Sequence, residues 1–283
     1  MTEPTSPTVH RRQLGKQLRL LRTNAGLDLS DAAAALGCHQ ARISRIETGK
    51  GGAVAKRDDV VTLCQRYGVD DDGTVQKLLT LLTNSQKPGW WEGLGLPPAL
   101  DIYIGLETDA RSERAWEPLL VHGALQTPDY ARAVLAAPKT HRPDDIEDGV
   151  ALREGRYRLL ARAASPLELW VIMDENTLLR PVGGADVMRE QLRHLRASAE
   201  LPNVTLQIFP LRKESHPGLG GAFALLEFEE DPPVAYVDSQ GGNLYLEKAR
   251  DVRGFGRTFD LLRASALDPD ESAERIERAI EEI

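Results

Sequence analysis

The stretch HQARISRIETGK, residues 39–50, decides the fold of the N-terminal part of the chain. Arg42 and Arg45 lie three positions apart around Ile43, and Ile46 follows Ile43 by about one helical turn. Positions three and four apart share one face of a helix, so the two isoleucines predict a buried face and leave the basic side chains on other faces. The stretch is therefore basic and half-buried, although the formal net charge of the 283-residue chain is −8.

Charge is distributed unevenly along the chain. Residues 1–57 contain ten Lys or Arg and four Asp or Glu, a net charge of +6. Residues 58–283 must then carry −14, the difference between −8 and +6. A basic module joined to an acidic body allows nucleic-acid binding by the first part despite the acidity of the whole.

Composition and length indicate a globular protein of two units. Hydrophobic residues make up 41% and charged residues 28%, which is ordinary for a folded domain. The sequence has no apolar run of the ~20 residues that cross a bilayer and no signal peptide, so we expect a cytoplasmic, nucleoid-associated protein that makes no membrane contact. The two cysteines and six histidines lack the spacing of a zinc site, and we expect neither a metal nor another cofactor.

The segments before residue 39 complete a helix-turn-helix pattern. Residues 12–24 form an amphipathic pattern, and Asp28 is a good N-cap for a short second helix, with Asp31 as the acidic member of a capping box. Two helices that cross at a tight turn need a small residue at the crossing, a glycine in the turn and apolar anchors on the second helix. These places are occupied by Ala33, Gly37, Ile43 and Ile46. A plain helical hairpin is the alternative interpretation.

The remaining faces of the second helix predict a DNA contact surface. Arg can bind guanine, Gln can bind adenine, and an Ala methyl can touch thymine. Glu47 cannot face phosphate favourably, so we expect it to be structural, as part of the helix-turn-helix core, and to pair with Arg19 or Arg22. The predicted DNA-binding residues are His39, Gln40, Ala41, Arg42, Ser44, Arg45, Thr48 and Lys50.

The run Ile43-Ser44-Arg45-Ile46-Glu47-Thr48-Gly49 resembles the third helix of the lambda-repressor-like, or XRE-type, transcriptional regulators. The resemblance covers about residues 12–83, and it implies further helices near 58–67 and 73–83. It implies a mainly α, five-helix DNA-binding domain over residues 1–83. Many relatives carry Gln as the second residue of helix two, where it contacts DNA. This chain has Leu29 at that position, so the resemblance does not supply that DNA contact.

After a Pro- and Gly-rich linker or lead-in at 84–103, residues 104–283 predict an α+β domain with a small sheet. We expect Trp90 and Trp91 to pack against this domain. Helical patterns lie at 107–116, 127–136, 145–163, 185–200, 247–266 and 270–282, and strand patterns at 167–173, 204–209, 222–228, 234–238 and 243–246.

The sequence carries no recognisable catalytic motif in this second domain. HPGLGGAF, residues 216–223, lacks the GK[ST] or GxGxxG spacing of a phosphate-binding loop, and no GxSxG occurs. We therefore expect no enzymatic activity, although an enzyme fused to a DNA-binding domain is an alternative.

Segments such as PGWWE (88–92), VTLQIFPL (204–211) and the run at 216–247 resemble the C-terminal domain of a large group of actinobacterial XRE-type regulators, a domain of unknown function. That resemblance implies an antitoxin-like transcriptional regulator and supplies no ligand or catalytic residue. We expect a homodimer that binds a near-palindromic operator in double-stranded DNA, with the acidic domain receiving a small-molecule effector or a small protein encoded by an adjacent gene. The alternative is an interaction module that binds such a protein and autoregulates its own operon.

Overall fold

The structure is a computed structural model that describes residues 7–49, 55–138, 142–213, 215–229, 231–238 and 243–283. The chain divides into two compact units, residues 1–89 and 90–283. Within the described ranges, no helix is both long enough and apolar enough to cross a membrane.

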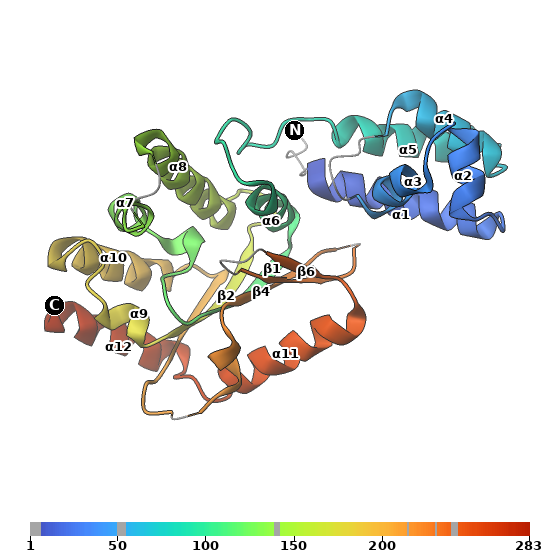
Figure 1. Ribbon diagram of the computed structural model, residues 1–283. Helices are drawn as coiled ribbons and strands as arrows, with labels where there is room; N and C mark the ends of the chain where they lie inside the picture. The colour runs from blue at the N-terminus through green and yellow to red at the C-terminus, as the bar shows by residue number, and fades with distance from the viewer. Residues whose placement is uncertain (1–6, 50–54, 139–141, 214, 230, 239–242) are drawn as a thin grey trace. The chain divides into compact units, whose positions relative to one another are not determined.

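The N-terminal unit has five helices among its described residues, as predicted, and they enclose one apolar core (Figure 1). Leu14, Leu18, Ile43, Val60 and Leu63 are at the centre of this core. The first helix begins earlier than the predicted residue 12. The helices are α1 (Pro7–Asn24), α2 (Leu29–Ala35), α3 (Gln40–Thr48), α4 (Arg57–Arg66) and α5 (Asp72–Asn84).

Local signals fix the ends of α2 and α3. The Asp28 side chain accepts hydrogen bonds from the backbone of α2, and the Asp31 side chain accepts one from the Asp28 backbone N–H. These reciprocal bonds confirm the predicted capping box. Gly37 in the following turn has φ +59° and Gly49 after α3 has φ +66°. Glycine adopts these left-handed conformations without the steric cost of a side chain, so both helices end where the glycines lie.

Helices α1 and α3 lie in close contact at Gly15. A Cβ atom on Gly15 would lie 2.4 Å from the carbonyl oxygen of Ile46 and 2.7 Å from that of Glu47. Only a residue without a side chain permits this approach. Gly15 therefore sets the position of α3 against α1.

The second unit contains a six-stranded mixed sheet with the strand order β3-β2-β1-β4-β5-β6. The first three strands are parallel, and β4, β5 and β6 continue from β1 in antiparallel pairs. The strands are β1 (Ser112–Glu117), β2 (Glu168–Asp174), β3 (Val204–Phe209), β4 (Phe223–Glu227), β5 (Val234–Val237) and β6 (Leu244–Leu246). The predicted α+β class is confirmed, and the sheet contains one strand more than the patterns indicated.

The helix predicted at 107–116 is wrong, because residues 112–117 form the central strand β1. The charged run SERAWE resembles the surface of a helix, but Glu113 in this strand is fully buried and takes part in internal polar contacts. Tertiary contacts therefore override local propensity. The real helix, α6 (Pro98–Asp109), starts inside the predicted lead-in, where Pro98 occupies the first helical turn.

The two tryptophans of the predicted lead-in pack within the second unit, as expected. The indole N–H of Trp91 donates to Asp101 at 2.6 Å, and that of Trp90 donates to the Thr108 hydroxyl at 3.0 Å. The Trp90 ring lies so close to α8 (Pro143–Leu160) that a Cβ on Gly155 would be 2.0 Å from it. Residues 90–97 therefore belong to the structure of this unit.

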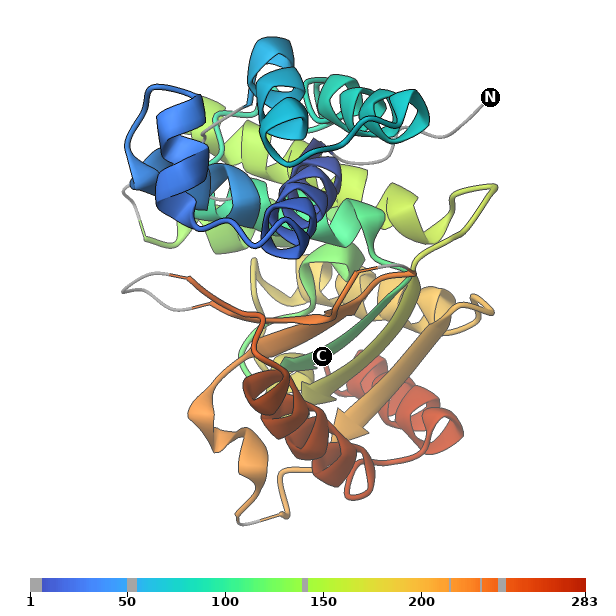
Figure 2. The same cartoon turned by 90° about the vertical axis from the view of Figure 1, so that its right-hand side faces the viewer.

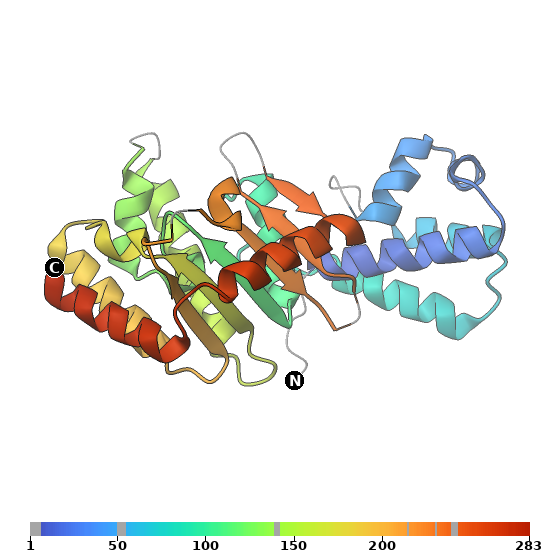
Figure 3. The ribbon, with the colours of Figure 1, turned by 90° about the horizontal axis from the view of Figure 1, so that it is seen from below.

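Helices cover both faces of the sheet (Figures 1 and 2). On one face, α11 packs Phe259 and Leu262 against Trp116, Ile172 and Phe209, and Figure 3 shows this helix in front of the strands. On the other lie α6, α7 and α8, while α10 packs against α12. The helices after α6 are α7 (Pro128–Ala136), α8 (Pro143–Leu160), α9 (Asn176–Leu179), α10 (Ala185–Ser198), α11 (Ala249–Arg263) and α12 (Pro269–Glu282), with short 3-10 turns η1 (Gly123–Leu125) and η2 (Pro217–Gly220).

Candidate DNA-recognition surface and a buried charge network

Helix α3 has one buried and one exposed face. Ile43 is 0% and Ile46 is 3% exposed, and both lie in the core of the unit with Ala33 of α2. Together with the left-handed Gly37, these contacts bring a small residue, a turn glycine and two apolar anchors to the positions that a helix-turn-helix needs.

A buried ion pair fixes the C-terminal half of α3. Nε of Arg22 donates to one oxygen of Glu47 at 2.6 Å and Nη2 donates to the other at 2.9 Å. Nη1 of Arg22 also donates to the backbone oxygen of Leu27 at 2.7 Å. The hydrogen bond to Glu47 raises the pKa of Arg22. Of the two predicted partners, Arg22 is the one that pairs with Glu47, so the Glu47 carboxylate is directed toward α1.

The opposite face of α3 carries most of the predicted DNA-binding residues. Nε of Arg45 donates to the backbone oxygen of Ala41 at 3.2 Å, and its two terminal nitrogens make no hydrogen bond to the described residues. The hydroxyl of Thr48 donates to the Ser44 backbone oxygen at 2.7 Å. Exposed side chains are those of His39, Gln40, Ala41, Arg45 and Thr48; Ser44 is half-buried, and Lys50 lies outside the described residues.

Arg42 differs from the other predicted contacts because it is already engaged. Its guanidinium binds the carboxylate of Asp59 in α4, with Nη2 at 2.6 Å and Nη1 at 3.3 Å from the two oxygens. This bond raises the pKa of Arg42. Asp59 also accepts from the backbone N–H of Lys56 at 2.7 Å and so caps α4. Arg42 must leave this ion pair to bind a base, whereas Arg45 is free to do so.

A second group of charged residues lies inside the C-terminal unit, between α6, β1 and α8. Arg156 of α8 binds the carboxylate of Glu107 in α6, with donor–acceptor distances of 2.7–2.9 Å. Glu107 is fully buried and Arg156 is 8% exposed. Burial disfavours the charged guanidinium, but the Glu107 carboxylate and the nearby Tyr103 outweigh it and raise the pKa of Arg156. Burial also raises the pKa of Glu107, and the bound guanidinium of Arg156 opposes that rise.

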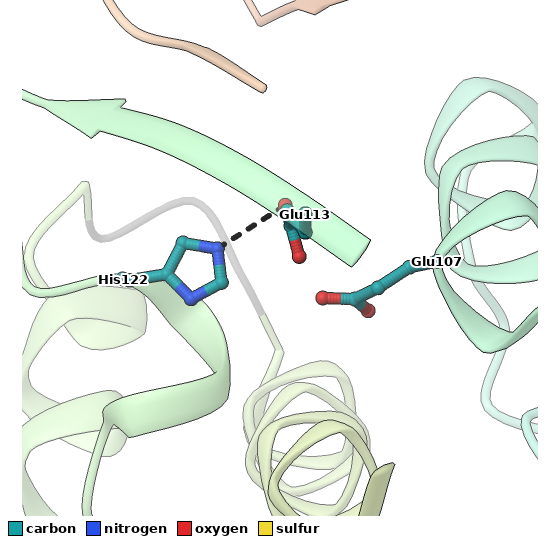
Figure 4. A group of neighbouring side chains, drawn as sticks. All are labelled: Glu107, Glu113 and His122. Carbon is teal, nitrogen blue, oxygen red and sulfur yellow. Dashed lines mark hydrogen bonds and ion pairs between the residues drawn. The ribbon is translucent and has the colours of Figure 1, made fainter. Parts of the chain in front are cut away.

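Glu113 and His122 form the adjoining part of this buried network, shown with Glu107 in Figure 4. Nε2 of His122 lies 3.4 Å from Glu113, and the hydroxyl of Tyr103 donates to the same Glu113 oxygen at 2.6 Å. Burial alone would raise the pKa of Glu113, but His122, Arg156 and Tyr103 lower it to about 2. Glu113 in turn raises the pKa of His122 against the effect of burial. The network therefore joins two carboxyl groups to one guanidinium and one imidazole, and Nδ1 of His122 accepts a hydrogen bond from the Ala124 backbone N–H at 3.4 Å.

Comparisons with known protein families place both units. Residues 100–278 match the model of a family described as Domain of unknown function (DUF5753). The chain belongs to this family. Residues 13–76 match a model described as a Helix-turn-helix domain, so the protein is a DNA-binding protein with a C-terminal DUF5753 domain, and the predicted resemblance is confirmed. Comparisons with curated proteins and with solved structures gave no match.

The buried residues Glu107, Glu113 and His122 of the DUF5753 domain do not fit a metal site. Ligand atoms of Glu107, Glu113 and His122 lie within 4.8 Å of one another, close enough for a shared ion. However, Arg156 binds both oxygens of Glu107, and its Nη2 is 3.4 Å from Nε2 of His122. A cation would have to displace the guanidinium from the space that it occupies. The arrangement is that of an internal ion-pair network, in which one oxygen of Glu113 has no hydrogen-bond partner among the described residues.

The DUF5753 domain also contains a cavity of about 210 Å³ beside this network. Glu117, the last residue of β1, lines it together with Arg153 and Arg156 of α8. Burial raises the pKa of Glu117 to about 7. No sequence signal marks the network or the cavity, because their residues have no characteristic spacing. They come from α6, β1, α8, β4, β5 and the start of η1.

Proposed function

We propose that the protein is a sequence-specific transcriptional regulator that binds DNA as a homodimer and receives a signal through its DUF5753 domain. The observation that carries the proposal is the division of α3 into two faces. Ile43, Ile46 and Glu47 hold the helix in the unit, while Gln40 and Arg45 are exposed. An exposed recognition helix in a basic module is what major-groove binding requires.

The free groups on α3 match the edges of bases. The terminal nitrogens of Arg45 can bind guanine O6 and N7 together, Gln40 can bind adenine N6 and N7, and the methyl group of Ala41 can contact a thymine methyl. Arg42 contributes to binding only if DNA competes with Asp59, so we assign the main selectivity to Arg45.

A homodimer would place two copies of α3 about 34 Å apart, one helical turn of DNA, on a near-palindromic operator. We place the protein in the cytoplasm, bound to the nucleoid, because its proposed ligand is chromosomal DNA. We assign the DUF5753 domain a receiving role and no catalytic one, which is supported by the way its buried charged groups bind one another.

A second function is supported by the net charge of −14 on residues 58–283. A strongly acidic body favours a basic partner, so the protein can also be an antitoxin-like module that binds a small protein encoded by an adjacent gene and autoregulates that operon. Co-purification of a stoichiometric small protein with the full chain, released by salt, would favour this function; purification of the chain alone under co-expression would count against it.

Selection of bound sequences from a random DNA pool tests the main proposal. We expect enrichment of a near-palindromic site whose half-site centres lie 10 or 11 base pairs apart, or a multiple of one helical turn. The expected affinity falls as salt is raised, because phosphate contacts release counterions. Enrichment of no sequence, with binding equally strong to any duplex, would refute sequence-specific regulation.

A further inference from the structure

The cavity of the DUF5753 domain lies where several strands end. Glu117 ends β1, and its neighbour Trp116 pairs with Phe223 at the start of β4. Tyr236 of β5 pairs with the next residue of β4, and Asp238 follows the end of β5. The carboxyl end of β1, where the sheet changes from parallel to antiparallel pairing, is therefore one wall of the cavity. In open α/β sheets, ligands bind in crevices outside the carboxyl ends of strands.

The sheet wall carries two acidic groups. Glu117 is half-buried, and neither Glu117 nor Asp238 has an ion pair or side-chain hydrogen bond with another described residue. Two carboxyl groups without a protein partner, one of them partly withdrawn from water, leave hydrogen-bonding capacity that a ligand donor can use.

The helical wall carries a cation that lacks a counter-ion. Leu152, Arg153 and Arg156 project from adjacent positions of α8 to line the cavity. Arg156 is neutralised by Glu107. Arg153 instead donates to the amide oxygen of Gln126 and to the Gly149 carbonyl oxygen, both at 2.8 Å, and it forms no ion pair with any described residue.

The third nitrogen of Arg153, Nη2, is unused by the described residues. Burial and the neighbouring Arg156 lower the pKa of Arg153 to about 10, as expected for a guanidinium without a nearby carboxylate. Because its other two nitrogens are held by neutral acceptors, the group is fixed in place and can present Nη2 to an anion.

We propose that this cavity binds a small zwitterion of the amino-acid type. Arg153 takes the carboxylate of the ligand, and Glu117 with Asp238 takes its ammonium group. Leu100, Leu152 and Phe223 surround its apolar part. A ligand with one charge would satisfy only one wall, whereas a zwitterion satisfies both. The inference rests on the proposed receiving role of the domain and names the chemical class of the signal.

The test begins with the full-length protein and the common L-amino acids as probes, by thermal shift and then by calorimetry. The tightest amino acid is compared with its deaminated and decarboxylated analogues; for L-leucine these are 4-methylpentanoate and 3-methylbutylamine. We expect each analogue to bind at least about 10-fold more weakly than the zwitterion, because each loses one charge-assisted contact. Equal affinity for zwitterion and analogue, or no binding by any amino acid, would overturn the proposal.

Substitutions then assign the two ends of the ligand. Arg153→Met should abolish the preference for the amino acid over the amine analogue, and Glu117→Gln should abolish the preference over the carboxylate analogue. Arg158→Met and Glu154→Gln are matched controls, because both residues are exposed on α8 and do not line the cavity. The proposal fails if the control and cavity variants change affinity alike, or if neither cavity variant changes it.

DNA binding separates this inference from the proposed function. Ligand binding at the cavity with no change in operator affinity would leave the site in place and refute its receiving role. Sequence-specific DNA binding without any amino-acid binding would refute the site and leave the DNA-binding function unaffected. A change in operator affinity of the wild type, lost in Arg153→Met, is the expected result.

Discussion

The buried pair between Arg22 and Glu47 is expected to be the main polar support of the recognition helix. Each residue is 7% exposed, and two charge-assisted hydrogen bonds join them. Removing one partner of a buried pair leaves an uncompensated charge and costs about 3–5 kcal/mol. We expect Glu47→Ala to lower the free energy of unfolding of the N-terminal unit by this amount, a large part of the ~5–15 kcal/mol typical of a domain.

The chain offers an internal reference for this measurement. All four tryptophans lie at position 90 or beyond, so tryptophan fluorescence follows the second unit, while hydrogen exchange of the α3 amides follows the first. In Glu47→Ala, the α3 amides should exchange at lower urea concentrations than in the wild type. The tryptophan fluorescence transition of the second unit should stay at the same urea concentration. Arg66→Met is the matched control, because the pair of Arg66 with Asp31 is exposed and should contribute less than about 1 kcal/mol.

The double variant Arg22→Met, Glu47→Leu decides whether the effect comes from the ion pair. Replacing both charges with apolar side chains of similar size leaves no unpaired charge. The double variant should therefore be more stable than Arg22→Met alone or Glu47→Leu alone. The reasoning would be refuted if Glu47→Ala cost less than about 1 kcal/mol, or if the double variant lost the sum of the single losses.

Three further predictions follow from particular contacts. Gly15→Ala should destabilise the N-terminal unit by about 1–3 kcal/mol in chemical denaturation, because the new Cβ meets the Ile46 carbonyl oxygen. Gly254→Ala in α11 is the control: its Cβ meets nothing within 4 Å and should stabilise the protein by up to about 1 kcal/mol. Equal effects of the two substitutions would contradict the close approach of α1 and α3. Asp59→Asn should release Arg42 and strengthen binding to all DNA sequences in anisotropy titrations, with a steeper salt dependence; unchanged affinity would show that Arg42 does not reach DNA. The raised pKa of Glu117 means that the folded state holds its proton more tightly than the unfolded state, so stability is lost as pH rises from about 4.5 to about 7. Glu117→Gln should therefore raise the free energy of unfolding by about 1 kcal/mol relative to wild type at pH 8, and little at pH 4, as measured by thermal unfolding. The gain is kept this small because Glu117 is partly exposed.

The N-terminal unit was predictable because its determinants are local. The offsets of Ala33, Gly37, Ile43 and Ile46 and the capping box at Asp28 act within a few helical turns, so spacing alone predicts the motif. Charge predicts that Glu47 turns away from phosphate toward an arginine of the first helix, but it does not distinguish Arg19 from Arg22; the structure selects Arg22. The ion pair of Arg42 with Asp59 was missed, because it depends on where α4 lies.

The C-terminal unit was predictable in class but not at its centre. The sequence of strand β1 predicts a helix because Glu113 and Arg114 make it polar, yet the strand is paired on both sides. Its buried carboxylate is stabilised by His122, Tyr103 and Arg156, which come from three other elements. Such long-range compensation leaves no periodic signal in the sequence.

The most direct test of the proposed function is the selectivity of Arg45→Ala. Affinity is measured by fluorescence anisotropy on the selected site, on single base-pair variants of that site and on scrambled DNA, at several salt concentrations. We predict a loss of about 1–3 kcal/mol on the selected site, discrimination abolished at one base pair in each half-site, and little change on scrambled DNA. An equal loss on every sequence, with a reduced salt slope, would make Arg45 a phosphate contact and contradict its assignment as the base-reading residue of α3.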